Sequence, residues 1–224
     1  MHNHTVTFVR EYGKPSMLRR ITILALLLVS SAAAVAADDA NSKYQDFLKA
    51  AKSGQPVDWQ AFRFAYAETA NFDVTGMKSA ATRKAMNEAL RANDYAAAIV
   101  QANLILEENY VDIDAHVVSD IANTKLGNTD EAKKQHAIAI GLLRSIRTGD
   151  GKTPETAFTV ITVHEEYSLI GVLGLRRQQQ AVIANAGHNY DVLDVIDKDG
   201  VGQTLYFQID HVLAAEAALL KRSH

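Results

Sequence analysis

Two stretches of this chain repeat at a spacing of 34 residues. The segment Asn93–Ile99 (NDYAAAI) aligns with Gly127–Lys133 (GNTDEAK), and Ala98 and Ala132 fall at the same position of the repeat. A period of this length is typical of stacked pairs of antiparallel helices, in which a small residue allows two helices to cross closely. The repeat therefore predicts helical hairpins over residues 79–146.

Helical periodicity and capping residues extend this pattern from residue 43 to residue 146. Asp58, Thr75, Asp94 and Asp112 each precede a helical stretch, where a carboxylate or hydroxyl side chain can accept a hydrogen bond from the first turn. Asn128 is followed three residues later by Glu131, which is the spacing of a capping box. We expect helices over Lys43–Ser53, Trp59–Thr69, Met77–Ala92, Tyr95–Glu108, Ile113–Leu126 and Thr129–Ile146.

The pattern changes at the linker Thr148–Pro154 (TGDGKTP). Beyond it, short β-branched or alternating stretches are typical of strands, and Lys198-Asp199-Gly200 is a hairpin turn signal. The predicted fold class is α+β: helical hairpins over residues 38–147, packed on a small, mostly antiparallel sheet with helices over residues 148–224. We expect strands over Ala157–Val163, Gln180–Ala186, Tyr190–Asp197 and Gln203–Asp210, and helices over His164–Leu173 and Val212–Lys221.

Residues 79–146 resemble a pair of tetratricopeptide repeats, so the predicted hairpins are tetratricopeptide-like. The sequence departs from that family at His116, Ser119 and Asp120, where the first helix of the second repeat would have an aromatic residue, Leu and Gly. The resemblance implies a surface that binds proteins or peptides and no chemistry of its own.

Several short motifs together resemble a family of exported bacterial proteins that is defined only as a domain of unknown function. They are the linker Ser145–Thr153, Glu155–Phe158 (ETAF), Glu165–Tyr167 (EEY) and Gly187–Asp191 (GHNYD). The resemblance covers most of the chain that follows the first 37 residues. It implies export and helical hairpins followed by a small α+β region, and it implies no reaction or catalytic residues.

The first 37 residues have the composition of a leader and a signal peptide. Met17–Arg20 is basic, Ile21–Val29 is apolar but too short to span a bilayer, and Ser30–Ala37 consists of small residues. Translation starts at Met1 or at Met17, and residues 1–16 are not needed for export. We therefore expect a periplasmic or secreted protein with no membrane anchor after cleavage.

Composition excludes several classes of function. The chain has no Cys, which excludes disulfides, thiolate catalysis and Cys-based zinc sites. The formal charge of the whole chain is −3, and removal of residues 1–37 changes it to −6 because four basic residues and one acidic residue are lost. Nucleic-acid binding requires a basic surface, so we expect no nucleic-acid partner.

Three motif fragments lack residues that their chemistry requires. Gly151-Lys152-Thr153 has Ile146 where a phosphate-binding loop needs Gly, and Asp197–Gly200 lacks the flanking carboxylates of a calcium loop. His164 is followed four residues later by Ser168, where a zinc-protease helix has its second His. We interpret them as a structural joint, a turn and an ordinary helix, and we predict no cofactor and no metal.

Basic and amide side chains recur on one face of a predicted helix. Arg83, Asn87 and Arg91 follow one another at four-residue steps, and Lys125 would face them from the next repeat. Arg can bind a carboxylate through two hydrogen bonds, and Asn can bind a peptide backbone. These four residues are our candidate peptide-binding site for an acidic or C-terminal segment, and the alternative is a solvated helix face.

His164, Glu165, His188 and Asp191 form an alternative polar cluster in the second part. If they meet in one pocket, they provide the acid, base or ligand groups of an enzyme. No complete catalytic set is recognisable, so our leading hypothesis is a non-enzymatic, exported module with a protein or peptide partner. The alternative is a small periplasmic hydrolase or metal-dependent enzyme with a site between the two regions.

The order of the signal-peptide regions predicts where the exported protein begins. Small residues at the −3 and −1 positions place the cleavage before Asp38 or before Ala37. Mass spectrometry of the exported protein should find one of these two termini. An intact Met1 or Met17 terminus would contradict both the predicted location and the predicted domain limits.

Overall fold

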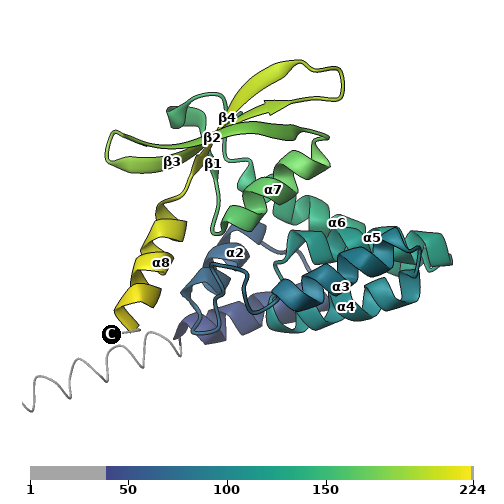
Figure 1. Cartoon of the computed structure of the whole chain (residues 1–224). Helices are drawn as coiled ribbons and strands as arrows, with labels where there is room; N and C mark the ends of the chain where they lie inside the picture. The colour runs from purple at the N-terminus through teal and green to yellow at the C-terminus, as the bar shows by residue number, and fades with distance from the viewer. Residues whose placement is uncertain (1–38, 223–224) are drawn as a thin grey trace, which may run out of the picture. The chain divides into compact units, whose positions relative to one another are not determined.

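The helices and strands follow the predicted order in a computed structural model that describes residues 39–222. Residues 39–52 are helical, and the first part continues with α2 (Trp59–Glu68), α3 (Ala80–Arg91), α4 (Tyr95–Glu108), α5 (Ile113–Leu126) and α6 (Thr129–Ile146). The second part contains the 3-10 turn η1 (Pro154–Thr156), β1 (Phe158–Thr159), α7 (Val163–Val172), β2 (Arg176–Asn185), β3 (His188–Ile196), β4 (Gly202–Gln208) and α8 (Asp210–Arg222) (Figure 1). The fold is α+β, as predicted.

The predicted signal peptide lies outside the described residues. Within residues 39–222, none of the helices has the length and apolar character needed to cross a membrane. The helical part and the α+β part together belong to one unit that begins at residue 40.

The predicted N-caps are present at three helices and absent at two. The cap predicted at Thr75 is wrong, because α3 begins at Ala80 and its N-cap residue is Ser79, whose side chain makes no capping bond. Side-chain oxygens of Asp58, Asp94 and Asp112 each accept a hydrogen bond from the backbone of the first helical turn. The capping box predicted at Asn128 is wrong, because the Asn128 side chain makes no capping bond to α6. Its amide instead donates to the Asn123 side chain at 3.0 Å, which ties the start of α6 to α5.

The repeat packs as helical hairpins, with each helix from α3 to α6 in contact with the next. Ala98 and Ala132 are buried, as the repeat requires. His116, which replaces an aromatic residue of the repeat, is buried, with Nε2 2.8 Å from the Tyr110 carbonyl oxygen and Nδ1 2.5 Å from Gln135 Oε1. Burial lowers the pKa of His116, and because a neutral imidazole has one N–H, the ring donates a hydrogen bond to one of these two acceptors.

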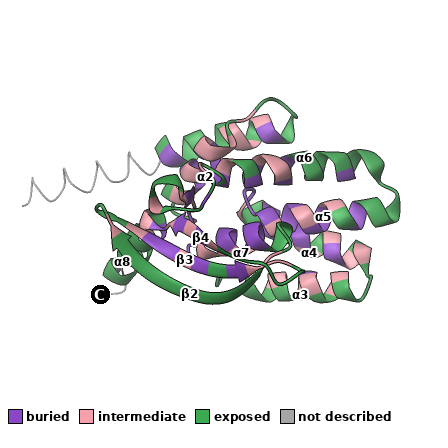
Figure 2. Ribbon diagram, turned by 90° about the horizontal axis from the view of Figure 1, so that it is seen from above, coloured by how far each residue is buried: buried purple, intermediate pink, exposed green. Residues whose placement is uncertain are grey.

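The sheet has the strand order β1-β4-β3-β2, with β1 parallel to β4 and the other pairs antiparallel. The predicted turn with Gly200 joins β3 to β4, and Gly200 has a φ of 83° there. A second turn at Ala186-Gly187, which the sequence analysis did not identify, joins β2 to β3. Figure 2 shows that the edge strand β2 is exposed along nearly its whole length. Both α7 and α8 lie on the side of the sheet that faces the helical part (Figure 1).

The strand expected over Ala157–Val163 is much shorter in the structure, because the chain leaves the sheet after Thr159. The Ile161 N–H donates to Glu165 Oε2 at 2.9 Å, so it no longer belongs to a strand ladder. Ile161 itself is buried in the core. The turn that replaces the end of the strand therefore carries the chain directly into α7.

Gly151 makes the segment before β1 a structural joint. Its N–H donates to the Thr156 carbonyl and its own carbonyl accepts from the Tyr206 N–H, both at 2.8 Å. A Cβ at this position would lie 2.4 Å from the Phe158 ring, and φ is 72°, so Gly is required. These contacts support the interpretation of Gly151-Lys152-Thr153 as a joint.

The buried alanines of the repeat should be sensitive to larger side chains. Leu at Ala98 or Ala132 would overpack the hairpins and should cost about 1 to 3 kcal/mol of unfolding free energy. Leu at Ala96 or Lys133, which are exposed on the same helices, serves as the control. Urea unfolding would measure the difference, and equal effects at all four positions would refute the 34-residue register.

Candidate functional site

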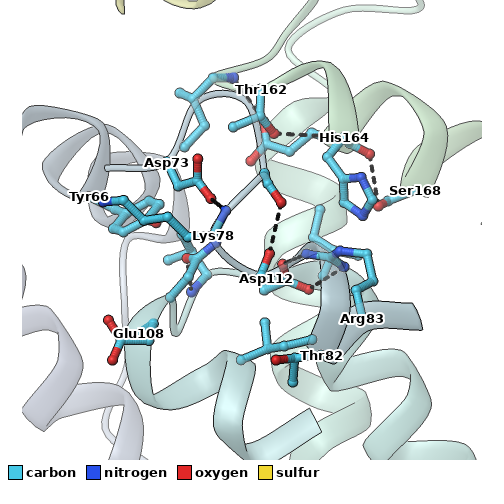
Figure 3. Close-up of a pocket in the computed structure, with 18 of the residues that line it drawn as sticks. Tyr66, Asp73, Lys78, Thr82, Arg83, Glu108, Asp112, Thr162, His164 and Ser168 are labelled. Atoms are coloured by element: carbon cyan, nitrogen blue, oxygen red, sulfur yellow. Dashed lines mark hydrogen bonds and ion pairs between the residues drawn. The ribbon is translucent and has the colours of Figure 1, made fainter. Parts of the chain in front are cut away.

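A cavity of about 320 Å³ lies between the helical part and α7 (Figure 3). It is bounded by the loop after α2, the start of α3, the end of α4, the start of α5 and the first turns of α7. In Figure 3, Tyr66, Asp73 and Lys78 lie on one side, and His164 and Ser168 lie on the other. Its apolar wall is formed by Leu104, Ile105, Val111, Ile113 and Ile161.

Arg83 is held at the cavity by carboxylates of α5. Its NH1 and NH2 donate to Asp112 at 3.2 and 2.5 Å, and NH1 also lies 3.5 Å from Asp114. Burial lowers the pKa of Arg83, but the Asp112 bond and the charges of both carboxylates outweigh this, so the net effect is a raised pKa. Arg83 therefore stays charged, and its charge is matched within the fold.

Asp114 connects α5 to α7. His164 Nε2 lies 2.8 Å from one carboxylate oxygen, and the Ser168 hydroxyl donates to the other at 2.7 Å. Burial alone would raise the pKa of Asp114. The hydrogen bond and charge of His164 and the hydrogen bond from Ser168 outweigh this effect, so the pKa of Asp114 is lowered. Since the carboxylate stands between His164 and Ser168, the hydroxyl is not bonded to the imidazole that would activate it as a nucleophile.

A buried ion pair joins α2 to α7, and its carboxylate, Glu165, also lines the cavity. Arg63 Nε donates to Glu165 Oε1 at 2.7 Å and NH2 donates to Oε2 at 2.5 Å. The remaining donors of Arg63 reach the Thr159 carbonyl at 3.0 Å and the Ser145 hydroxyl at 3.2 Å. The Arg63 side chain is fully buried and that of Glu165 is 8% exposed. One guanidinium thus fixes α2, α6, the end of β1 and α7.

The structure separates the four residues of the candidate peptide-binding site, Arg83, Asn87, Arg91 and Lys125, which we call the basic stripe. Arg83 lines the cavity and is engaged by Asp112 and Asp114. Asn87 is half-buried, while Arg91 and Lys125 are exposed, and none of the three side chains makes a hydrogen bond or ion pair within residues 39–222. The stripe therefore begins at the cavity and continues along α3 and α5 as unengaged groups.

The structure also divides the alternative polar cluster. His164 and Glu165 line the cavity. His188 lies elsewhere, with Nδ1 2.6 Å from Asp210 Oδ2, and buried Asp191 accepts from the Gln180 amide on β2. Within residues 39–222, no three His, Asp or Glu side chains are grouped so that they could hold a metal ion.

The charged residues that engage the side chains of the site were not predicted from the sequence. Asp112 was identified only as a helix cap, and Asp114 and Arg63 were not singled out. Asp112-x-Asp114 at a helix start could have been noticed, since it places two carboxylates beside the basic stripe. Arg63 gives no comparable signal, because it lies in an aromatic helix and its partner is 102 residues away.

The family of the chain follows from comparison with known proteins. The model of a domain of unknown function (DUF4919) matches residues 57–218, which include the cavity, α7 and the sheet. The chain belongs to this family. The resemblance to a domain-of-unknown-function family is thereby confirmed. No curated protein and no solved structure matches the chain.

The ion pair between Arg63 and Glu165 should dominate the stability of the region around α7. Arg63→Met would leave Glu165 buried without a cation, and the free energy of unfolding should fall by about 3 to 5 kcal/mol. Adding Glu165→Leu should recover part of the loss, because the unpaired charge is removed.

The control is Lys84→Met, which breaks the exposed Lys84–Glu88 pair of 3.9 Å and should cost under about 1 kcal/mol. Urea unfolding of all variants would provide the comparison. A loss at Arg63→Met no larger than that of the control would contradict the structural role assigned to the buried pair.

Proposed function

We propose that this protein is an exported, non-enzymatic interaction module that binds a peptide segment of a partner protein in the cavity beside α7. The proposal rests on the composition of the cavity, which combines apolar residues with polar residues that are already paired within the fold. Apolar side chains line the cavity together with polar ones, of which Arg83 is paired with Asp112 and His164 is hydrogen-bonded to Asp114. In a preformed site of this kind, less conformational entropy of the side chains is lost when a ligand binds.

Several polar groups that line the cavity have few or no hydrogen-bond partners in the described residues and are therefore available to a bound peptide. The Thr82 hydroxyl and the Glu108 carboxylate make no hydrogen bond within residues 39–222, and the Lys78 ammonium has only the Asn71 carbonyl at 3.3 Å. These groups are able to bind backbone amides and carbonyls, while Leu104 and its apolar neighbours receive a large apolar side chain.

The unengaged part of the basic stripe suggests how the peptide continues. Asn87 and Arg91 follow the cavity residue Arg83 along α3, and α5 runs beside α3 from the cavity to Lys125. Two helical turns separate Arg83 from Arg91, a rise of about 12 Å that corresponds to roughly four extended residues. We therefore expect an apolar anchor residue followed, within about four residues, by Asp or Glu.

A second candidate function is hydrolysis, and the bond between His164 and Asp114 favours it. A carboxylate that holds one imidazole nitrogen orients the ring so that the other nitrogen can act as a base. The His164 side chain is 40% exposed and lines the cavity. Because the Ser168 hydroxyl is not bonded to His164, the nucleophile of such an enzyme would be a water molecule.

The proposal is tested by filling the cavity. Thr82→Trp places a large ring in it, whereas Ala96→Trp, on the exposed side of α4, is the matched control. A fluorescent peptide library with an apolar residue followed by Asp or Glu should bind the wild type and the control. Binding to Thr82→Trp should be at least about tenfold weaker, with an unchanged melting temperature.

Charge reversal separates the two parts of the site. Arg91→Glu with Lys125→Glu should remove the preference for acidic residues while an apolar peptide still binds. If Thr82→Trp binds the same peptides as the wild type, the cavity is not the binding site. Cleavage of library peptides that is lost in His164→Gln would instead favour the hydrolase.

A further inference from the structure

The face of α7 that points away from the cavity carries a buried carboxyl group. Glu166 is completely buried, and Asp191 on β3 is 3% exposed. The two residues belong to the EEY and GHNYD motifs, which are distant in the sequence and are brought together where α7 packs on the sheet. Neither takes part in the cavity.

The hydrogen-bond donors around this pair are too few for two carboxylates. Both oxygens of Glu166 and Oδ1 of Asp191 are buried and receive no hydrogen bond from an N–H or hydroxyl group within residues 39–222. Oδ2 of Asp191 accepts from the Gln180 amide. The ionisation of Glu166 is coupled to that of Asp191, so the two groups are neighbours. Three of their four oxygens are buried without a hydrogen-bond partner, and because ionised carboxylates only accept hydrogen bonds, a proton on one of the two groups would supply the donor that the pair lacks.

The surrounding charges also favour a protonated group. Burial is the largest cause that raises the pKa of Glu166, to about 9, and the charges of Asp191 and of the neighbouring Glu165 add to it. The charge of Glu165 is itself matched by Arg63 on α2. On β2, Arg177 binds Gln180 and the Tyr167 hydroxyl, so it reaches Asp191 only through the Gln180 amide.

We propose that Glu166 and Asp191 share a single proton in the folded protein, and that this proton is a pH-sensitive fastening between α7 and the sheet. With the proton in place, the contact is one hydrogen bond between an acid and a carboxylate. Without it, two buried negative charges face each other with no cation between them, and the packing of α7 on β2 and β3 is opposed. This inference does not depend on what the cavity binds.

The direction of the pH dependence follows from the two states of the chain. In the unfolded chain Glu166 ionises near its ordinary pKa of 4.5, whereas in the folded protein it keeps its proton up to about pH 9. The stabilisation is therefore complete below about pH 4.5 and is lost as the pH rises toward 9. Within this window the unfolding equilibrium constant should rise by up to about tenfold per pH unit through this group alone.

Replacement of the titrating group provides the test. Gln at Glu166 keeps a hydrogen-bond donor for Asp191 and cannot ionise, so Glu166→Gln should remove this part of the pH dependence. Glu107→Gln, at an exposed position of α4, is the matched control and should follow the wild type. Urea unfolding from pH 5 to pH 9 should show the ratio of wild-type to Glu166→Gln unfolding constants increasing steadily with pH.

A measurement on the wild-type protein covers the case in which Glu166→Gln does not fold. Carbon-13 NMR of the side-chain carboxyl groups should show Glu166 still protonated at pH 7. Titration of Glu166 near its ordinary pKa, or parallel unfolding profiles of the wild type and Glu166→Gln, would overturn the proposal. The proposal would also be overturned if a divalent cation stabilised the wild type and EDTA removed that stabilisation, because a metal ion would then occupy the place of the shared proton.

Discussion

The bond between Arg63 and Glu165 is the constraint on which the rest of the structure depends. A buried guanidinium costs several kcal/mol to desolvate, and only a partner with matching geometry offsets that cost. Glu165 supplies that partner through two bonds, and Thr159 and Ser145 occupy the remaining donors. The pair therefore determines where α7 begins relative to α2, and the position of α7 creates both the cavity on one side and the acid pair on the other.

Three consecutive residues of α7 show how neighbouring ionisable groups are stabilised by different means. His164 is half-exposed and binds a carboxylate, Glu165 is buried and binds a cation, and Glu166 is buried and has no cation. Successive residues of a helix point about 100° apart, so each faces a different element. A helix with this sequence is consistent with one packing arrangement, because any rotation would bring a carboxylate into an unsuitable environment.

The sequence was informative where structure depends on local patterns. The Asp caps, the 34-residue period and the turn at Gly200 are encoded within a few residues or within one repeat, and each is present in the structure. The shortened β1 was not predictable, because Glu165 captures the Ile161 N–H only after α7 has packed. The pairing of polar groups at the cavity has the same origin, since residues from α3, from the start of α5 and from α7 meet only in the folded chain.

The basic stripe shows that helical spacing alone does not predict which charged residues are paired within the fold. Four-residue spacing places Arg83, Asn87 and Arg91 on one helix face, but it does not reveal which of them meet carboxylates within the fold. Asp112 and Asp114 neutralise Arg83, so this residue supports the wall of the cavity and offers little net charge to a partner. If the cavity binds an acidic segment as we propose, its attraction would fall to Arg91 and Lys125, and because exposed charges bind weakly, the affinity would come mainly from the apolar residues of the cavity. In the proposed site the charges would select the partner and the cavity would hold it.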